Sequence, residues 1–303
     1  MSQQKEKFPA LPPAVDAERR EIDGRAGRLS YYVAGRGAPL LLIHSINAAG
    51  SVYEVKPVFE RYRRTRRVFA VDLPGFGFSE RSQREYTPRL YVESLHDMLD
   101  AITADAGARP VDALALSLSS EFLARAATER PDGFHSLALV TPTGFNRGAH
   151  KFRRGRGSTR EVPGLHRTLT VGLWRRGLYD LLTKRSVIRY FLERTFGSKD
   201  IDEGLWDYDW HTAHWPGAEH APLAVLSGRL FSADIRDVYE QIELPVFMPH
   251  GTRGDFRDFS EADWTRSRPN WSIHAFDSGA LPFFEVPDLF FAAYDDFLAQ
   301  PER

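Results

Sequence analysis

The segment ALALSLSSEF, residues 113–122, has the form of a buried strand that ends at a serine and continues into a helix. Its first four residues are apolar, which is typical of a strand covered on both faces of a parallel sheet. The small residues Ala115 and Ser119 lie two positions before and two positions after Ser117. Small side chains at these places let a strand and a helix pass close together around an exposed residue at the turn. This predicts a sharp turn at Ser117, and the alternative at this point is an ordinary serine at a helix N-cap.

Apolar runs of strand length recur along the chain and alternate with helical patterns. They cover residues 39–45, 67–73, 110–116, 134–142, 244–251 and 271–277. Two shorter segments, 19–24 and 28–35, precede them and predict an antiparallel start. This alternation predicts an α/β fold with a mostly parallel sheet.

The alternation stops near residue 144 and returns near residue 233, which divides the chain into parts. We predict one α/β core from residues 17–143 and 233–303, with a helical insert over residues 144–232. Residues 1–16 are polar and rich in proline, and we predict a flexible N-terminal tail there.

The composition excludes several classes of protein. The chain has no cysteine, so disulfides, thiol nucleophiles and thiolate metal sites are excluded. Its net charge of -1 gives no support to nucleic-acid binding. No run of about 18 apolar residues is present and the N-terminus lacks an apolar signal segment, so we predict a cytoplasmic protein without a transmembrane helix.

Further segments fit a known family when they are considered together with residues 113–122. They are LLLIHS (40–45), VFAVDLPGFGFSE (68–80), LPVFMPHGTRGD (244–255) and SGALPFFEVPDLFFAAYDDFL (278–298). Together they resemble the α/β-hydrolase superfamily along nearly the whole core, and they are most similar to its cap-bearing branch of esterases, haloperoxidase-like enzymes and epoxide hydrolases. The resemblance implies an eight-stranded, mostly parallel sheet with a helical cap inserted after the sixth strand.

The resemblance also implies roles for individual residues. Ser117 stands at the nucleophile position, as in esterase-type members, whereas epoxide hydrolases carry an aspartate there. The backbone N–H groups of Ile46 and Leu118 stand at the oxyanion-hole positions. Asp255 stands at the position of the family's acid, with Asp258 as the second choice.

The family's catalytic histidine is absent from its position. The family pattern G-H-x-P-x-x-E-x-P corresponds here to GALPFFEVP, residues 279–287, so Ala280 replaces the histidine. Without a base, a serine hydroxyl is a poor nucleophile. The family's His-Gly pair after the third strand reads His44-Ser45 here, and His44 is expected to be structural.

Three histidines of the insert are candidates to reach Ser117 from above. They are His211, His214 and His220, and they lie among tryptophans. The alternative is an aromatic-rich cap that simply packs on the core. His211 and His214 lie on one side of a helix, but a metal site needs more ligands, and we predict no metal and no cofactor.

The stretch from residue 147 to residue 176 contains nine lysines and arginines against Glu161 alone. Such a run is either a solvated edge of the insert or a site for an anionic substrate or an acidic membrane surface.

Three functions remain open from the sequence. The first is an esterase-like or acyl-transfer enzyme with an atypical triad, and the second is a protein without catalysis that binds a small apolar or amphipathic molecule between cap and core. The third is a lyase or isomerase that uses the same pocket without an acyl-enzyme. An aromatic content of 13% favours an apolar pocket in all three.

Overall fold

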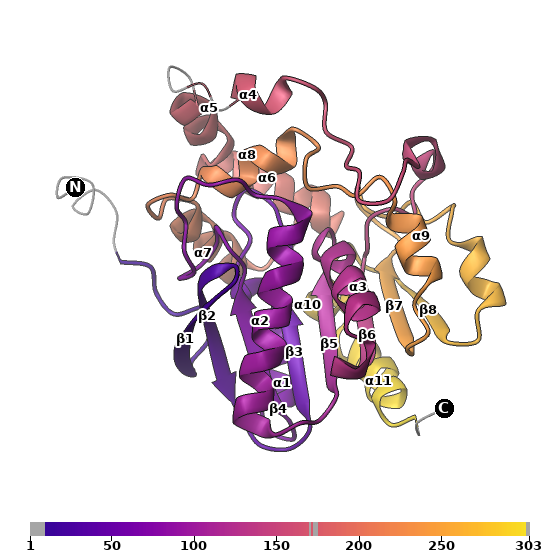
Figure 1. The fold of residues 1–303 in the computed structure, drawn as a ribbon. Coiled ribbons are helices and arrows are strands. Elements are labelled where there is room, and N and C mark those ends of the chain that lie inside the picture. Colours follow the sequence, from indigo (N-terminus) through magenta and orange to yellow (C-terminus); the bar gives the residue numbers. More distant parts are fainter. Residues whose placement is uncertain (1–9, 170, 172–174, 301–303) are drawn as a thin grey trace.

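The computed structural model describes residues 10–169, 171 and 175–300, and it contains one eight-stranded sheet with helices on both faces (Figure 1). The strands are β1 (Glu18–Gly24), β2 (Gly27–Ala34), β3 (Pro39–Ile43), β4 (Arg67–Asp72), β5 (Val111–Leu116), β6 (Phe134–Val140), β7 (Val246–Gly251) and β8 (Trp271–Phe276). Their order in the sheet is β1-β2-β4-β3-β5-β6-β7-β8. β2 pairs antiparallel with β1 and β4, and all other neighbours are parallel. The predicted fold class is confirmed.

Helices cover the two faces of the sheet and form two separate hydrophobic clusters. The core helices are α1 (Lys56–Tyr62), α2 (Pro88–Ala106), α3 (Ser119–Glu129), α9 (Ile235–Glu240), α10 (Pro282–Glu285) and α11 (Pro287–Leu298). Side chains of α2, α3 and α9 pack in one cluster, and those of α1, α10 and α11 pack in the other. The central strands are buried on both faces, which explains their continuous apolar runs.

The segment between β6 and β7 is mostly helical. It contains α4 (Leu165–Leu169), α5 (Arg175–Leu182), α6 (Arg185–Phe196), α7 (Glu203–Ala213) and α8 (His220–Leu226), after the short 3₁₀ helix η3 (Ala149–Phe152). Three other 3₁₀ helices occur: η1 (Val52–Val55), η2 (Pro131–Gly133) and η4 (Asp263–Ser267). Figure 1 shows α4 to α8 above the ends of the strands, on the side where β5 leads into α3.

The N-terminal segment differs from the predicted flexible tail. Residues 1–9 lie outside the described residues, but Leu11, Ala14 and Val15 are buried. The Ala14 N–H donates a hydrogen bond to the Tyr32 hydroxyl at 3.1 Å. Leu11, Ala14 and Val15 therefore belong to the hydrophobic cluster that also contains α1, while the prolines between them are exposed.

Candidate active site

Ser117 lies in a strained turn between β5 and α3. Its φ is 49°, in the left-handed region that non-glycine residues rarely adopt. The Ser117 N–H donates to the Val140 carbonyl at 2.9 Å, and the Ser117 carbonyl accepts from the Ser120 N–H at 3.1 Å. These two hydrogen bonds hold the strained backbone in place, as functional turns require. The predicted sharp strand-to-helix turn is present.

The two small residues around Ser117 are completely buried. Ile43 of β3 pairs with Ala115 of β5, so the ends of these strands lie side by side. Ser119, which replaces the second glycine of the family motif, donates a hydrogen bond from its hydroxyl to the His44 carbonyl at 2.6 Å. This bond fastens the start of α3 to the loop after β3.

We expect Ala115→Leu to destabilise the fold by about 1–3 kcal/mol, because the larger side chain overpacks the contact between β5 and its neighbours. Ala115→Gly, which restores the family's glycine, is the matched control and should cost at most about 1 kcal/mol. Urea unfolding of both variants checks this. Equal stabilities would show that the space around Ala115 is larger than the structure indicates.

His44 has a structural role. Its Nε2 accepts a hydrogen bond from the Leu73 N–H at 3.0 Å, so the neutral ring carries its proton on Nδ1, which donates to the Ser45 carbonyl at 2.6 Å. The ring is fully buried, and burial lowers the pKa of His44 to about 4. Both ring nitrogens are thus occupied in holding the loop after β3 against the turn after β4.

The lowered pKa of His44 predicts a loss of stability in acid. An unfolded histidine takes up a proton near pH 6.5, whereas the buried His44 remains neutral down to about pH 4. Stability is therefore lost as the pH falls from 6.5 to 4, and the expected loss is roughly 3 kcal/mol. Urea unfolding of the wild type and of His44→Gln across this range measures it. Both proteins share all other titrating groups. The difference between their plots of unfolding free energy against pH therefore reports on His44 alone, and parallel plots would contradict the lowered pKa of His44.

A buried carboxyl group organises the loop that contains Ile46. Glu54 Oε2 accepts from the Ser45 N–H at 2.7 Å, and Oε1 accepts from the Ser45 hydroxyl at 2.9 Å and from the Asn47 side-chain amide at 2.7 Å. Burial raises the pKa of Glu54. Glu54 thus fixes both neighbours of Ile46, and Ser45 replaces the family's glycine by taking part in this network. The sequence reasoning missed Glu54, for which the only signal is a glutamate within the apolar segment VYEV.

The backbone amides of Ile46 and Leu118 are placed near this turn. Leu118 directly precedes α3, where the first N–H groups of a helix lack acceptors within the helix. Within the described chain, neither N–H group donates a hydrogen bond. The Ser119–His44 bond brings the loop of Ile46 next to Leu118. Their function as an oxyanion hole is a proposal that we develop below.

Ala280 lies at the same corner of the sheet as Ser117. The Thr141 hydroxyl donates to the Ala280 carbonyl at 2.8 Å, and Thr141 directly follows Val140, whose carbonyl accepts from the Ser117 N–H. Thr141 also has a positive φ of 48°, which is strained for a β-branched residue. The two positions therefore meet through the end of β6. No sequence signal indicated this second strained residue.

Within the described residues, no base is hydrogen-bonded to the serine hydroxyl. The Ser117 side chain is partly exposed, and its Oγ forms no hydrogen bond with any residue in the part of the chain that the structure describes. Serine needs an adjacent general base to become nucleophilic. The position occupied by Ala280 supplies only a methyl group.

Asp255 faces the surface and pairs with the insert. Its carboxylate lies 2.5 Å from the Arg194 guanidinium, and both side chains are exposed. Its N–H donates to the Arg194 carbonyl at 3.0 Å. Asp258, the second choice, accepts hydrogen bonds from the N–H groups of Arg147 and Ser260. The role of Asp255 as the acid of a triad stays a prediction.

The C-terminal end of α6 is bonded to the loops of Asp255 and Ala280, where the sequence resemblance implies the acid and the base. The Arg194 carbonyl accepts from the Asp255 N–H, and the Thr195 carbonyl accepts from the Ala280 N–H at 2.9 Å. Carbonyls in the last turn of a helix lack partners within the helix, so these bonds satisfy them. A Cβ on Gly279 would lie 2.4 Å from the Phe196 backbone, so only glycine permits this approach. Both loops thus serve as attachment points for the insert.

The comparison with known families agrees with this geometry. The family model described as alpha/beta hydrolase fold matches residues 38–162, which include β3 to β6 and the turn at Ser117. The chain has the α/β-hydrolase fold. The turn at Ser117 has the geometry of a nucleophile elbow. That Ala280 stands in the place of the histidine stays a prediction from the sequence.

Curated relatives of this chain are hydrolases. A 2-hydroxymuconate semialdehyde hydrolase of Pseudomonas putida is 31% identical over 128 residues, which cover 42% of this chain and 44% of that protein. A 2-hydroxy-6-oxo-6-(2'-aminophenyl)hexa-2,4-dienoic acid hydrolase of Metapseudomonas resinovorans is 35% identical over 79 residues, 25% of this chain and 26% of the relative. The chain therefore matches less than half the length of these relatives.

Solved structures share the fold over almost the whole chain. A probable hydrolytic enzyme from Pseudomonas aeruginosa PAO1 has a TM-score of 0.71 and 19% identity, covering 96% of each chain. A meta-cleavage product hydrolase from Pseudomonas fluorescens IP01 has a TM-score of 0.70 and 16% identity, covering 92% of this chain and 97% of that one. At these identities the likeness establishes the fold alone.

The insert histidines lie next to other groups. His211 Nε2 lies 3.5 Å from Asp207, and His214 Nδ1 lies 2.7 Å from the Trp210 carbonyl. His220 Nε2 lies 3.9 Å from Glu219. Within residues 10–169, 171 and 175–300, none of the three is hydrogen-bonded to Ser117, and no cluster of three metal-ligating side chains occurs.

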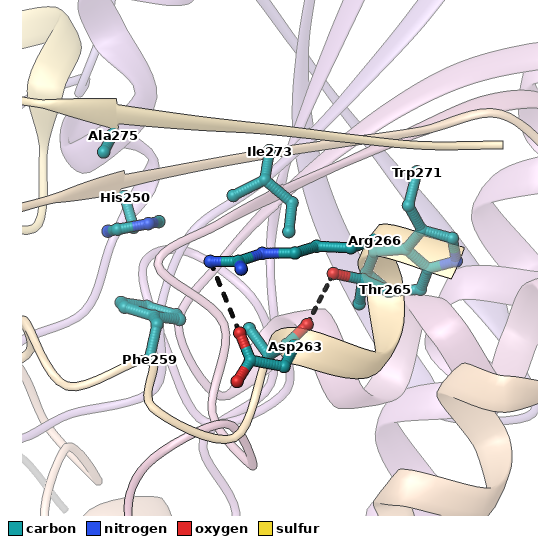
Figure 2. A pocket seen from close by; sticks show the side chains of 9 residues that line it. His250, Phe259, Asp263, Thr265, Arg266, Trp271, Ile273 and Ala275 are labelled. Carbon is teal, nitrogen blue, oxygen red and sulfur yellow. Dashed lines mark hydrogen bonds and ion pairs between the residues drawn. The ribbon is translucent and has the colours of Figure 1, made fainter. Parts of the chain in front are cut away.

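A cavity of about 540 Å³ lies elsewhere, between β7, β8 and the connection that joins them (Figure 2). It is lined by His250, Phe259, Ala262, Asp263, Thr265, Arg266, Trp271, Ile273 and Ala275. The His250 ring stacks on Phe259 with their centres 4.2 Å apart, and Arg266 forms an ion pair with Asp263 at 3.4 Å. None of its lining residues belongs to the Ser117 turn, so this cavity is separate from the candidate active site.

Proposed function

We propose that this α/β-hydrolase binds a small, largely apolar carbonyl compound at Ser117, beneath the insert, and hydrolyses esters slowly or not at all. The observation that carries the proposal is the partly exposed Ser117 hydroxyl at a strained elbow, to which no base among the described residues is hydrogen-bonded. Residues 144–232 serve as the cap in this proposal, which Figure 1 supports by the position of their helices.

Recognition of a carbonyl oxygen does not require a histidine. The N–H groups of Ile46 and Leu118 are candidates to donate hydrogen bonds to that oxygen, as oxyanion-hole amides do. The side chains of Ile46 and Leu118 are buried and apolar, which favours an apolar ligand body. The names of both curated relatives include an aldehyde or a 6-oxo group. We therefore propose an aldehyde or ketone as the ligand class.

Ester hydrolysis with an atypical base is the second candidate function, because the elbow geometry and the family favour it. It requires a proton acceptor for Ser117 that cap movement would bring into place. His211, His214 and His220 are the candidates for that role. We further propose that the protein acts in the cytoplasm, which its lack of cysteine supports.

Benzophenone tests the binding proposal because it is an aryl ketone and also crosslinks to nearby C–H groups under ultraviolet light. We expect it to bind about tenfold more tightly than diphenylmethane, which has a similar shape and no carbonyl, because two hydrogen bonds contribute roughly 1.4 kcal/mol together. Calorimetry measures both affinities, and peptide mapping should place the crosslink in residues 44–49, 117–122 or 144–232. Equal affinities, or crosslinks confined to the cavity of Figure 2, would refute the proposal.

A further inference from the structure

The insert differs from the rest of the chain in charge. Residues 144–232 contain 15 lysines and arginines and nine aspartates and glutamates, a net charge of +6. Because the whole chain has a net charge of -1, the remaining residues carry -7. The protein is therefore electrically polarised, with its positive end above the ends of the strands (Figure 1). Such polarity orients a protein in an external field of fixed charges.

Part of this positive charge is exposed and unpaired with acids. Lys151, Arg154 and Arg156 lie on the surface around η3, and within the described residues none of them forms an ion pair. Arg153, between them, pairs with Asp237. Three cations are thus presented on one short exposed segment.

Apolar side chains lie exposed beside these cations. Phe152, Val162 and Leu226 are each about half exposed. The Arg160 guanidinium carbon lies 5.1 Å above the Phe152 ring, and the Val162 N–H donates to the Ser227 carbonyl at 3.0 Å, next to Leu226. These contacts join them into one surface, which the outermost helix α4 extends without burying a residue of its own. Seven of the nine large exposed apolar residues in the described chain belong to the insert.

We propose that this surface, the basic–apolar face made of Lys151, Phe152, Arg154, Arg156, Val162 and Leu226, docks on an anionic lipid bilayer. Exposed apolar side chains enter the headgroup boundary of a bilayer, and basic residues beside them are attracted to anionic lipids. Each basic residue near such a surface strengthens binding by roughly fivefold, so the three together contribute on the order of 100-fold. Acidic protein partners provide charge but no apolar layer for Phe152 to enter, so a bilayer matches both features.

Docking by this face would be peripheral. No helix in the described residues is long and apolar enough to cross a bilayer. Because the helices of the insert lie above the ends of the strands, where β5 leads into α3, the docked protein would present that side of the molecule to the lipid (Figure 1). The docking itself does not depend on the proposed ligand, so either proposal can fail without the other.

Vesicle co-sedimentation tests the charged half of the face. The full chain should bind vesicles in which about a third of the lipid is phosphatidylserine at least tenfold more tightly than phosphatidylcholine vesicles, with binding that weakens as salt rises. Arg154→Glu with Arg156→Glu should weaken binding at least tenfold. Arg36→Glu with Arg64→Glu is the matched control, since both arginines are exposed at the opposite end of the sheet and the change in net charge is the same. If both pairs weaken binding equally, net charge alone acts and the proposal is wrong.

The apolar half of the face has its own test. Phe152→Ser should weaken binding to the phosphatidylserine vesicles several-fold, whereas Leu289→Ser, at an exposed position of α11, should leave it unchanged. Heparin serves as an anionic probe without an apolar layer. Heparin binding that equals vesicle binding, together with no effect of Phe152→Ser on the vesicles, would identify a simple polyanion site and overturn the lipid proposal.

Discussion

Purified wild-type protein is expected to hydrolyse 4-nitrophenyl butyrate no faster than its Ser117→Ala variant at neutral pH. The reason is that no described residue is hydrogen-bonded to the Ser117 hydroxyl, and that Ala280 stands where the family resemblance implies the histidine. In a serine protease, the loss of the histidine lowers turnover roughly a million-fold. Initial rates of both proteins against buffer alone measure the difference. A wild-type rate well above that of Ser117→Ala would show that a base reaches Ser117, and substitution of His211, His214 and His220 in turn would then identify it.

The second large effect is expected from Ala280→His. This substitution should raise ester turnover by about 100-fold rather than a million-fold, because it supplies a base but no orienting acid. The Asp255 carboxylate is held by Arg194 at the surface, and in subtilisin a triad without its aspartate retains about 100-fold more activity than one without its histidine. The gain should disappear in Ala280→His with Ser117→Ala.

Ala280→Asn is the matched control for Ala280→His, because it adds a polar side chain of comparable size without a base. It should show no gain in turnover. Arg194→Gln in the Ala280→His background should add a further increase, since it releases the Asp255 carboxylate. If Ala280→His gives no more turnover than Ala280→Asn, the backbone at Ala280 does not direct a side chain towards Ser117.

The sequence predicted the core well because its signals are local. The buried strands are short apolar runs, and α2 begins at Thr87 and Pro88, a favourable N-cap and first-turn pair, where the Thr87 side chain accepts from the Leu90 N–H. The elbow at Ser117 was predictable from the small residues Ala115 and Ser119. These features depend on neighbours within a few residues, so composition and spacing reveal them.

The parts that the sequence did not predict depend on contacts between distant residues. The Ser119 hydroxyl binds a carbonyl 75 positions away, and the Thr141 hydroxyl binds one 139 positions away. The attachment of α6 to the loops of Asp255 and Ala280 uses backbone carbonyls, which carry no residue-specific signal. Residues 10–16 resemble a flexible tail because two prolines and Asp16 interrupt their apolar residues. Three of those apolar side chains are nevertheless buried.

The most direct test of the central claim, an elbow serine without a base, is labelling by a fluorophosphonate probe. This reagent modifies serines whose hydroxyl has been activated by a neighbouring base. Intact-protein mass spectrometry at neutral pH should show the wild type unmodified under conditions that fully label an ordinary serine hydrolase. A stoichiometric adduct that maps to Ser117 and is absent from Ser117→Ala would contradict the account.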